Sequence, residues 1–408
     1  MNTRPLRREA EESTPCERRA APPIGTLAAL LLLLAAPFLA AAGCQGEGGL
    51  GDDGVEIETK PRFSNWPEHE DPVYEEPMDE PVDEEPETPA STYPLRTEGN
   101  RIVREDGSEW IGRGMNIHDT RSCNACTDQE PDVEEVKRRI DEAVDVWGAD
   151  FIRLNMESYG GGGSNSAPIT EDGDYLDDIV EIVDYIGTKP DVYVLLSLWH
   201  DPSFSSLGWP TNATADVWEI LTIALEGRPH VMFGLVNEPQ ANNDGALDAQ
   251  VWQAMNDTVA RIRSAEQALG LPPRIVVVQG TGGYARWLDY YVRRPIEAGG
   301  GENVAYETHV YNSASDFERL FETPSRSLPV IIGEFGPFQA SSMTLSDTAE
   351  MMERAEAAGV PYLAWTFHQR CPPNLLVDHS NNGCGVAMPL EPTEWGLQVM
   401  ERLAQPVD

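Results

Sequence analysis

The sequence predicts an α/β protein built as a single (β/α)8 barrel, and three observations lead to this prediction. Eight apolar runs of strand length occur between residues 110 and 367. Amphipathic segments of helix length separate them in regular alternation, which is typical of β/α units around a parallel sheet. The first run is followed by His118-Asp119-Thr120-Arg121 and lacks the glycine-rich phosphate turn that is usual in an open, doubly wound sheet.

The expected elements can be assigned in chain order. Residues 95–97 and 101–103 flank the turn-prone Glu98-Gly99-Asn100, so we expect a short hairpin before the barrel. The expected strands are Trp110 to Ile117, Asp150 to Met156, Val192 to Trp199, Val231 to Val236, Arg274 to Gln279, Val304 to Val310, Val330 to Phe335 and Pro361 to Phe367. The expected helices include Val133 to Trp147, Tyr175 to Ile186, Ala215 to Leu225, Leu247 to Leu269, Asp347 to Ala358 and Trp395 to Leu403.

The first 93 residues are expected to lie outside the barrel domain, which we place at residues 94–408. Residues 1–44 are typical of an export signal, because five arginines precede an apolar run from Leu27 to Ala42. Residues 45–93 have many prolines, and eleven acidic residues without Lys or Arg occur between Glu68 and Glu87. Such a segment is expected to be disordered and, through self-repulsion, to act as an extended acidic tether.

The end of the apolar run indicates how the chain is anchored. Small residues directly before Cys44 resemble a bacterial lipoprotein cleavage site, so Cys44 is the expected lipidation site. Ala41 stands where such signals usually carry Leu, which leaves an ordinary signal peptide or an uncleaved anchor as alternatives. All three place the barrel outside the cytoplasm, secreted or at the bacterial cell envelope, because the arginines stay inside. We expect membrane contact only through this N-terminal segment.

Four cysteines follow the export segment, and an even number suits disulfides in an oxidising compartment. Pairing of Cys123 with Cys126 and of Cys371 with Cys384 is favoured, and cross-pairing is the alternative. The Cys123-Asn124-Ala125-Cys126 spacing also occurs in half of a zinc site. No second close pair follows it in the sequence, so we expect no structural metal.

The net charge of −40 restricts the partners that this chain can bind. A field of that sign repels nucleic acids and acidic membrane surfaces, whereas it leaves a neutral polysaccharide unaffected. Solubility alone would also account for the charge. We expect a monomer with a polysaccharide substrate and no nucleic-acid partner.

Two glutamates end apolar runs in a way that indicates catalysis. Glu238 follows the fourth run in Gly234-Leu235-Val236-Asn237-Glu238-Pro239, and Glu334 closes the seventh in Ile331-Ile332-Gly333-Glu334-Phe335-Gly336. The carboxyl ends of barrel strands face the active site, so these two side chains are expected to converge. Retaining cleavage of a glycosidic bond requires two carboxyl groups. One protonates the leaving oxygen, and the other attacks the anomeric carbon. That chemistry needs no metal or cofactor, and none is expected.

Across residues 95–405 the sequence resembles glycoside hydrolase family five, the cellulase family A, within the clan of TIM-barrel retaining glycosidases. Asn237-Glu238-Pro239 is the most specific match; the resemblance implies that Asn237 holds the sugar 2-hydroxyl, that Glu238 is the acid/base and that Glu334 is the nucleophile. It also implies that Arg153 fixes the nucleophile. His309 and Tyr311 match the family pair near the two acids.

Further residues are expected to contact the sugar. His200 resembles the family histidine beside the cleaved bond, although Leu198 stands where many members have Asp. Trp365 looks like the family platform on which a pyranose ring stacks. Trp199, Trp209 and His368 are candidates to line the groove, and any of these aromatics could instead be packing residues.

The resemblance implies an endo-acting retaining β-glycanase, with β-1,4-glucan as the expected substrate and mannan as the alternative. A surface lipoprotein that binds polysaccharide without cleaving it is a different class of hypothesis. Asn237, Glu238 and Glu334 argue against it, because a binding protein has no physical need for two apposed carboxyls. An unrelated barrel enzyme with coincidental motifs would instead leave the two glutamates far apart.

Overall fold

Eight parallel strands close into a barrel, which confirms the predicted fold class. Going round the barrel, the strand order is β10-β3-β4-β5-β6-β7-β8-β9, so sequential strands are neighbours and the last pairs with the first. Each strand overlaps one of the eight predicted runs. The strands are β3 (Arg113–His118), β4 (Phe151–Met156), β5 (Tyr193–Leu198), β6 (Val231–Gly234), β7 (Val276–Gln279), β8 (Val304–Val310), β9 (Val330–Phe335) and β10 (Tyr362–Ala364).

This computed structural model describes residues 94–121, 131–157, 168–203, 205–239, 241–338, 342–379 and 385–407. The predicted export segment with Cys44, the tether and three of the disulfide candidates, Cys123, Cys126 and Cys384, lie outside the described residues. Cys371 is described and is half-buried. The disulfide pairing therefore stays a prediction.

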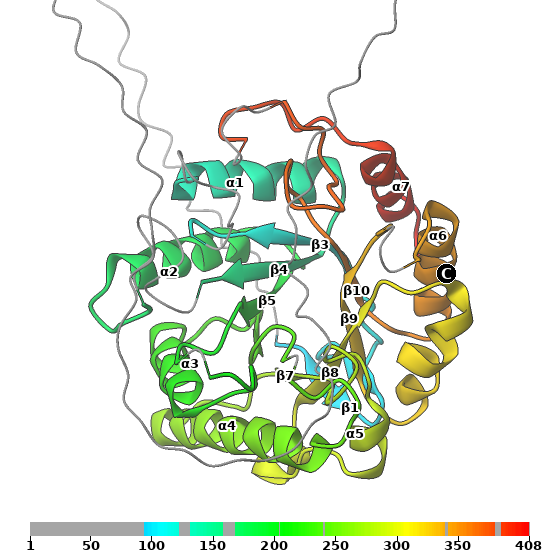
Figure 1. Cartoon of the computed structure of the whole chain (residues 1–408). Coiled ribbons are helices and arrows are strands. Elements are labelled where there is room, and N and C mark those ends of the chain that lie inside the picture. The colour runs from blue at the N-terminus through cyan, green and yellow to red at the C-terminus, as the bar shows by residue number, and fades with distance from the viewer. Residues whose placement is uncertain are drawn as a thin grey trace, which may run out of the picture. The chain divides into compact units, whose positions relative to one another are not determined.

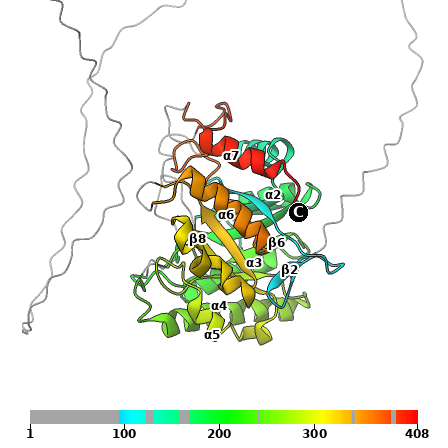
Figure 2. The same ribbon diagram turned by 90° about the vertical axis from the view of Figure 1, so that its right-hand side faces the viewer.

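Helices surround the barrel (Figures 1 and 2) and pack their apolar faces against the outward side chains of the strands. All six predicted helices are present. The helices are α1 (Val133–Asp141), α2 (Asp174–Gly187), α3 (Asn212–Ala224), α4 (Asp248–Leu269), α5 (Asp289–Arg293), α6 (Leu345–Ala357) and α7 (Glu394–Leu403). Short π-helical or 3-10 turns are η1 (Glu142–Val146), η2 (Ala298–Gly301), η3 (Ala314–Asp316), η4 (Glu318–Glu322) and η5 (Pro324–Arg326).

Side-chain caps explain where several helices begin. Asp132 accepts a hydrogen bond from the backbone N–H of Glu135 at the start of α1, and Thr393 accepts one from Gly396 at the start of α7. Thr344 and Asp347 form a reciprocal capping box at α6. Each cap satisfies backbone donors that the first helical turn leaves unpaired. No helix in the described part of the chain is long and apolar enough to span a membrane.

The predicted hairpin is present and covers one end of the barrel. Strands β1 (Arg96–Glu98) and β2 (Arg101–Val103) pair antiparallel. Leu95, Ile102 and Trp110 join a hydrophobic cluster with barrel-interior residues such as Phe151 and Tyr193, each of which begins its strand. The hairpin therefore covers the amino-terminal end of the barrel, and the carboxyl ends of the strands remain available for a site.

The barrel interior changes from apolar to polar along the strands. Side chains two residues apart on a strand share a face, so Phe151 at the base of β4 places Arg153 and Asn155 on the inner face above it. On β8, Ala305 lies in the same basal cluster, and Glu307 and His309 follow it on the inner face. The carboxyl ends therefore carry a layer of buried polar groups above a hydrophobic base.

A β-bulge on β9 sets the direction of Glu334. Thr308 pairs with Ile332, but the next residue, His309, pairs with Glu334, so Gly333 is an extra residue in the ladder. Ile331 belongs to the basal cluster of the interior, and regular alternation would direct Glu334 outward. The extra residue shifts the register and brings Glu334 to face the barrel interior, a common use of bulges beside active sites.

Candidate active site

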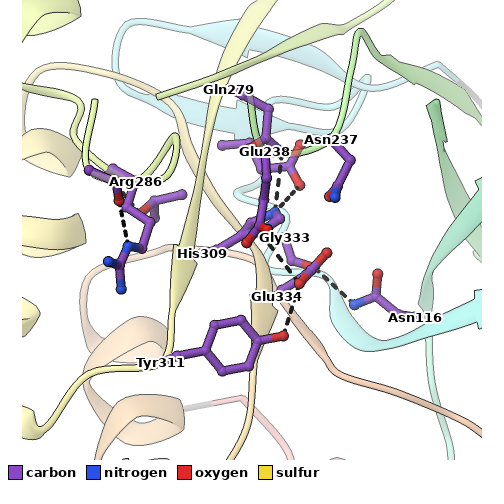
Figure 3. Close-up of polar contacts among 12 residues, drawn as sticks. Asn116, Asn237, Glu238, Gln279, Arg286, His309, Tyr311, Gly333 and Glu334 are labelled. Carbon is purple, nitrogen blue, oxygen red and sulfur yellow. Dashed lines mark hydrogen bonds and ion pairs between the residues drawn. The ribbon is translucent and has the colours of Figure 1, made fainter. Parts of the chain in front are cut away.

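Glu238 and Glu334 converge at the carboxyl end of the barrel, as the sequence predicts (Figure 3). A carboxylate oxygen of each residue and one ring nitrogen of His309 all lie within 4.8 Å of one another. This proximity contradicts the alternative of an unrelated barrel in which the two glutamates are far apart. The Glu334 side chain is 5% exposed and the Glu238 side chain is 12% exposed, so Glu238 is the more accessible of the two.

Glu334 is held from both sides by donors. Nη1 of Arg153 donates to Oε1 over 3.0 Å, and the Tyr311 hydroxyl donates to Oε2 over 2.8 Å. Arg153 is fully buried. Its guanidinium also donates to Asn116 and Asn155, at 2.9 and 2.8 Å, which fixes the side chain in place.

Asn237 and Glu238 follow β6 on a strained stretch of backbone. Glu238 has a φ of 41°, a left-handed conformation that residues other than glycine seldom adopt and that is concentrated at functional sites. Oδ1 of Asn237 accepts a hydrogen bond from Nη2 of Arg153 over 2.8 Å. With its oxygen engaged in this way, Asn237 keeps its amide N–H groups for another partner.

His309 lies between carboxylates. Its Nδ1 is 3.1 Å from Oε1 of Glu238 and 3.4 Å from Oε2 of Glu334, and its Nε2 is 3.0 Å from Oε1 of Glu307. Burial lowers the pKa of His309, but the negative charges of Glu334, Glu238 and Glu307 outweigh this effect and raise it to about 9. The ring therefore bridges the two candidate catalytic carboxyls.

Opposing effects act on the ionisation of Glu334. Burial raises its pKa, the cations His309 and Arg153 lower it, the neighbouring Glu238 raises it, and the hydrogen bond from Tyr311 lowers it. The net direction is upward from the ordinary glutamate value. Arg153, His309 and Tyr311 are therefore needed to keep this buried carboxyl ionised near neutral pH.

Four buried residues of this site were not predicted from the sequence: Asn116, Asn155, Gln279 and Glu307. Asn116 and Asn155 hold Arg153, while Gln279 and Glu307 contact Nε2 of His309 at 3.1 and 3.0 Å. Each side chain lies on the inner face of its strand. Each is two residues away from another polar residue or two residues after an apolar residue of the same face. Polar residues at this spacing inside apolar runs are the sequence signal that could have identified them.

Aromatic side chains cluster at the carboxyl end of the barrel, where β3, β5 and β10 finish. The rings of Trp199 and Trp365 stack with centroids 5.5 Å apart and planes 23° apart. His118, at the end of β3, meets Trp365 and His368 edge-on, each at 5.5 Å. His118 was not predicted, whereas Trp199, Trp365 and His368 were.

The two remaining sugar-contact candidates differ in position. His200 is exposed and its ring meets Trp199 edge-on at 6.1 Å, which places it at the margin of the aromatic cluster. Trp209 is 7% exposed and belongs to the main hydrophobic core, which supports the packing interpretation for this residue.

Within the described residues, Glu238, His309 and Glu334 are also the group whose nitrogen and oxygen atoms are close enough together to hold a metal ion. The same atoms hydrogen-bond or ion-pair with one another and with Arg153 and Tyr311. Two carboxyls, a buried arginine and a tyrosine hydroxyl are sufficient for acid/base and nucleophilic chemistry at a glycosidic bond.

Comparison with known proteins agrees with this geometry. The family model described as Cellulase (glycosyl hydrolase family 5) matches residues 103–370. Comparison with curated sequences finds no significant relative.

Among solved structures, the cellulase Cel5C_n is similar with a TM-score of 0.62 and 21% identity, covering 79% of this chain and 96% of that one. The β-glucanase SdGluc5_26A from Saccharophagus degradans has a TM-score of 0.59 at 20% identity, with 77% and 93% covered. A β-mannanase from Thermomonospora fusca has a TM-score of 0.57 at 20% identity, with 76% and 94% covered. At these identities the likeness establishes the shared fold.

Proposed function

The chain belongs to the cellulase family, glycosyl hydrolase family 5, and is a glycoside hydrolase; from this premise we propose that it is a retaining endo-β-glycanase acting on β-1,4-glucan. The observation that carries the proposal is the proximity of Glu238 and Glu334, because one carboxylate oxygen of each lies within 4.8 Å of the other. Carboxyl groups about 5 to 5.5 Å apart suit retention, whereas about 6.5 to 9.5 Å is needed to place a water for inversion.

The surroundings of each glutamate support its proposed role. Glu334, with one oxygen on Arg153 and the other on Tyr311, is the anion that attacks the anomeric carbon. Glu238 is the more exposed carboxyl and contacts His309 through Oε1, and its role is to protonate the leaving glycosidic oxygen.

The proposed reaction is a double displacement. As Glu334 forms a bond to the anomeric carbon, the bond to the leaving oxygen breaks, and that oxygen takes the proton of Glu238. Glu238 then removes a proton from water, whose oxygen attacks the same carbon and releases Glu334. The hydrogen bond from Tyr311 to Oε2 weakens the nucleophile in the ground state and assists its departure in the second step.

The substrate proposal rests on the aromatic cluster and on Asn237. Trp365 is 8% exposed and stacks on the half-buried Trp199, and the stacked pair supplies an apolar surface suited to the face of a pyranose ring. The amide of Asn237, oriented by Arg153, can donate to the 2-hydroxyl of the sugar bound next to Glu334. Equatorial hydroxyls of a β-1,4-glucan leave flat, apolar ring faces that such a surface binds.

Mannan is the second candidate, because similar structures include β-mannanases, from Thermomonospora fusca and from Streptomyces thermolilacinus with mannohexaose, as well as the cellulase and the β-glucanase. A non-catalytic polysaccharide-binding lipoprotein is less well supported, because burying apposed carboxyls is costly and contributes nothing to binding a neutral polymer. We also propose that the chain acts outside the cytoplasm, secreted or anchored through Cys44.

The test is to incubate the full-length chain with carboxymethyl cellulose, mixed-linkage glucan, mannan and xylan and to measure new reducing ends. The Glu334→Gln variant is the matched control, because it keeps the size of the side chain and removes the nucleophilic charge. Activity on the glucans that disappears in Glu334→Gln supports the proposal, and activity on mannan alone replaces glucan with mannan. If none of the four polymers yields new reducing ends, the endo-glycanase proposal is wrong.

A further inference from the structure

A third carboxylate, Glu307, lies beneath the two glutamates of the proposed active site. It stands on the inner face of β8, two residues before His309, and its side chain is fully buried. Its Oε1 is 3.0 Å from Nε2 of His309 and 3.0 Å from Nε of Arg153. The double displacement assigns no step to Glu307, although burying a charge requires compensation.

The position of Glu307 determines where protons lie on the His309 ring. A carboxylate oxygen only accepts, so the short contact to Nε2 requires that nitrogen to carry a proton. The opposite nitrogen, Nδ1, faces oxygens of Glu238 and Glu334 at 3.1 and 3.4 Å. Both ring nitrogens therefore face acceptors, which is the environment of an imidazolium and not of either neutral tautomer.

Arg153, on β4, pairs with both Glu307 and Glu334. The amide nitrogen of Gln279, on β7, lies 3.1 Å from Nε2 of His309 and hydrogen-bonds Glu307. An amide nitrogen and a protonated Nε2 are both donors, so they make no hydrogen bond to each other and share the Glu307 carboxylate as their acceptor. With Glu238 holding the proton of the acid, two cations offset two carboxylates. Arg153 and charged His309 then leave no net charge on this buried cluster, as low-dielectric burial favours.

We propose that Glu307 is a positioning residue that keeps His309 in its cationic form, so that Nδ1 donates a proton to the carboxyls of Glu238 and Glu334. This inference rests on the roles proposed for the two glutamates. Donation to Oε1 of Glu238 directs the acidic proton to its other oxygen, and the positive charge beside Glu334 favours the ionised nucleophile. A neutral His309 that is protonated on Nε2 has no proton on Nδ1 to donate to Glu238 and no positive charge beside Glu334.

The structure around Glu307 shows that its place is tightly constrained. A Cβ atom at Gly333 would overlap Oε1 of Glu307, so glycine is required at the bulge where the carboxylate passes. Arg153 lowers the pKa of Glu307 against the effect of burial, and the hydrogen bond from His309 lowers it further. The carboxylate thus remains charged beside the ring.

The first test is NMR of the full-length wild-type chain labelled with 15N-histidine, assigned among its seven histidines with His309→Asn. Both ring nitrogens of His309 should be protonated at pH 7, with a titration midpoint near pH 9. A ring that lacks the proton on either nitrogen at pH 7 would overturn the proposal. This measurement needs neither substrate nor a Glu307 variant.

The second test compares Glu307→Gln with Glu266→Gln. Glu266 is also a buried carboxylate between two arginines, Arg263 and Arg274, but it lies on α4 outside the barrel. In Glu307→Gln the midpoint of His309 should fall by about 1 to 3 pH units, the size of effect expected for loss of an adjacent opposite charge. Glu266→Gln should leave it in place. An unchanged midpoint in Glu307→Gln would contradict the proposal.

The kinetic test is the acid limb of kcat/KM, which should move to higher pH in Glu307→Gln and not in Glu266→Gln. Loss of the His309 charge, 3.4 Å from Glu334, makes the nucleophile harder to ionise. If Glu307 acted only as a buried salt-bridge partner and His309 kept its charge, removing a negative neighbour would instead ease ionisation of Glu334 and move the limb to lower pH. Inactivity of the wild type on every glycan would refute the proposed function and leave the NMR result standing.

Discussion

Gly333 and Glu307 are in mutual contact across neighbouring strands, and a Cβ atom at position 333 would overlap Oε1 of Glu307. This pair joins the bulge that directs Glu334 inward to the carboxylate beneath His309. The inward direction of Glu334 and the placement of Glu307 beside His309 therefore both depend on glycine at position 333.

Gly333→Ala should destabilise the fold by about 1 to 3 kcal/mol, the range typical of overpacking a buried site, and should also lower turnover because Glu334 is displaced. Thermal unfolding and kcat measure the two effects. A double-mutant cycle with Glu307→Ala is the control, since removing the carboxylate relieves the overlap. If Gly333→Ala lowers the free energy of unfolding equally in the wild type and in Glu307→Ala, the contact with Glu307 does not cause the destabilisation.

Tyr311→Phe should reduce kcat about 10- to 100-fold, the value of a hydrogen bond to a charged acceptor, because the hydroxyl contacts Oε2 of Glu334 at 2.8 Å. Steady-state kinetics on the polymer measures this loss. Tyr306→Phe, on the same strand β8, is the matched control, because the Tyr306 hydroxyl accepts from the backbone N–H of Ile296 and does not contact the acids. A loss of turnover as large in Tyr306→Phe would show that the effect is general destabilisation.

Glu238→Ala should slow hydrolysis about 10²- to 10⁴-fold for substrates with poor leaving groups, since they need a proton as the bond breaks. Aryl glycosides with activated leaving groups should lose much less in the bond-breaking step, because the departing phenolate is already stable. Comparing kcat/KM across a series of leaving groups tests the acid role. Equal losses across the series would argue that Glu238 has another role.

The sequence predicted the barrel, its strands and the two glutamates, because apolar periodicity and strand-end motifs are local signals. The bulge at Gly333 and the positive φ of Glu238 were not predictable in this way, since both depend on which neighbouring strand supplies the pairing partner. Glu307 was visible in the sequence beside His309. Its role required knowing that Arg153, from a different strand, contacts the same oxygen.

The elevated pKa of His309 makes stability depend on pH in a defined direction. The folded value is about 9, above the ordinary value of about 6.5, so the stabilisation is complete below pH 6.5 and is lost as pH rises through 9. The contribution is up to about 3 kcal/mol. The difference in free energy of unfolding between wild type and His309→Asn should therefore shrink from pH 6.5 to 9.5.

His230 supplies the opposite control for this pH dependence. His230 is buried against the Val183 carbonyl oxygen of α2, and burial lowers its pKa. Its contribution to the free energy of unfolding is therefore lost as pH falls and does not change between pH 7 and 9.5. Denaturant unfolding of His230→Gln beside wild type should show a constant difference over that range. A constant difference for His309→Asn as well would mean that the ring is not charged in the folded protein.

The start of the barrel domain can be located by truncation. A chain that begins at Pro94 should keep the melting temperature and activity of the full-length protein, because the hairpin residues that contact the barrel remain. A chain that begins at Arg104 should lose both, since it removes Leu95 and Ile102 from the basal cluster and the hydrogen bond from Thr97 N–H to Asn303 Oδ1 at 2.8 Å. Burial of two such side chains is worth about 3 to 6 kcal/mol, a large share of the stability of a typical domain. If the chain from Pro94 unfolds, residues before 94 contribute to the fold and the domain boundary lies earlier; if the chain from Arg104 melts like the full-length protein, the hairpin is not needed to close the barrel.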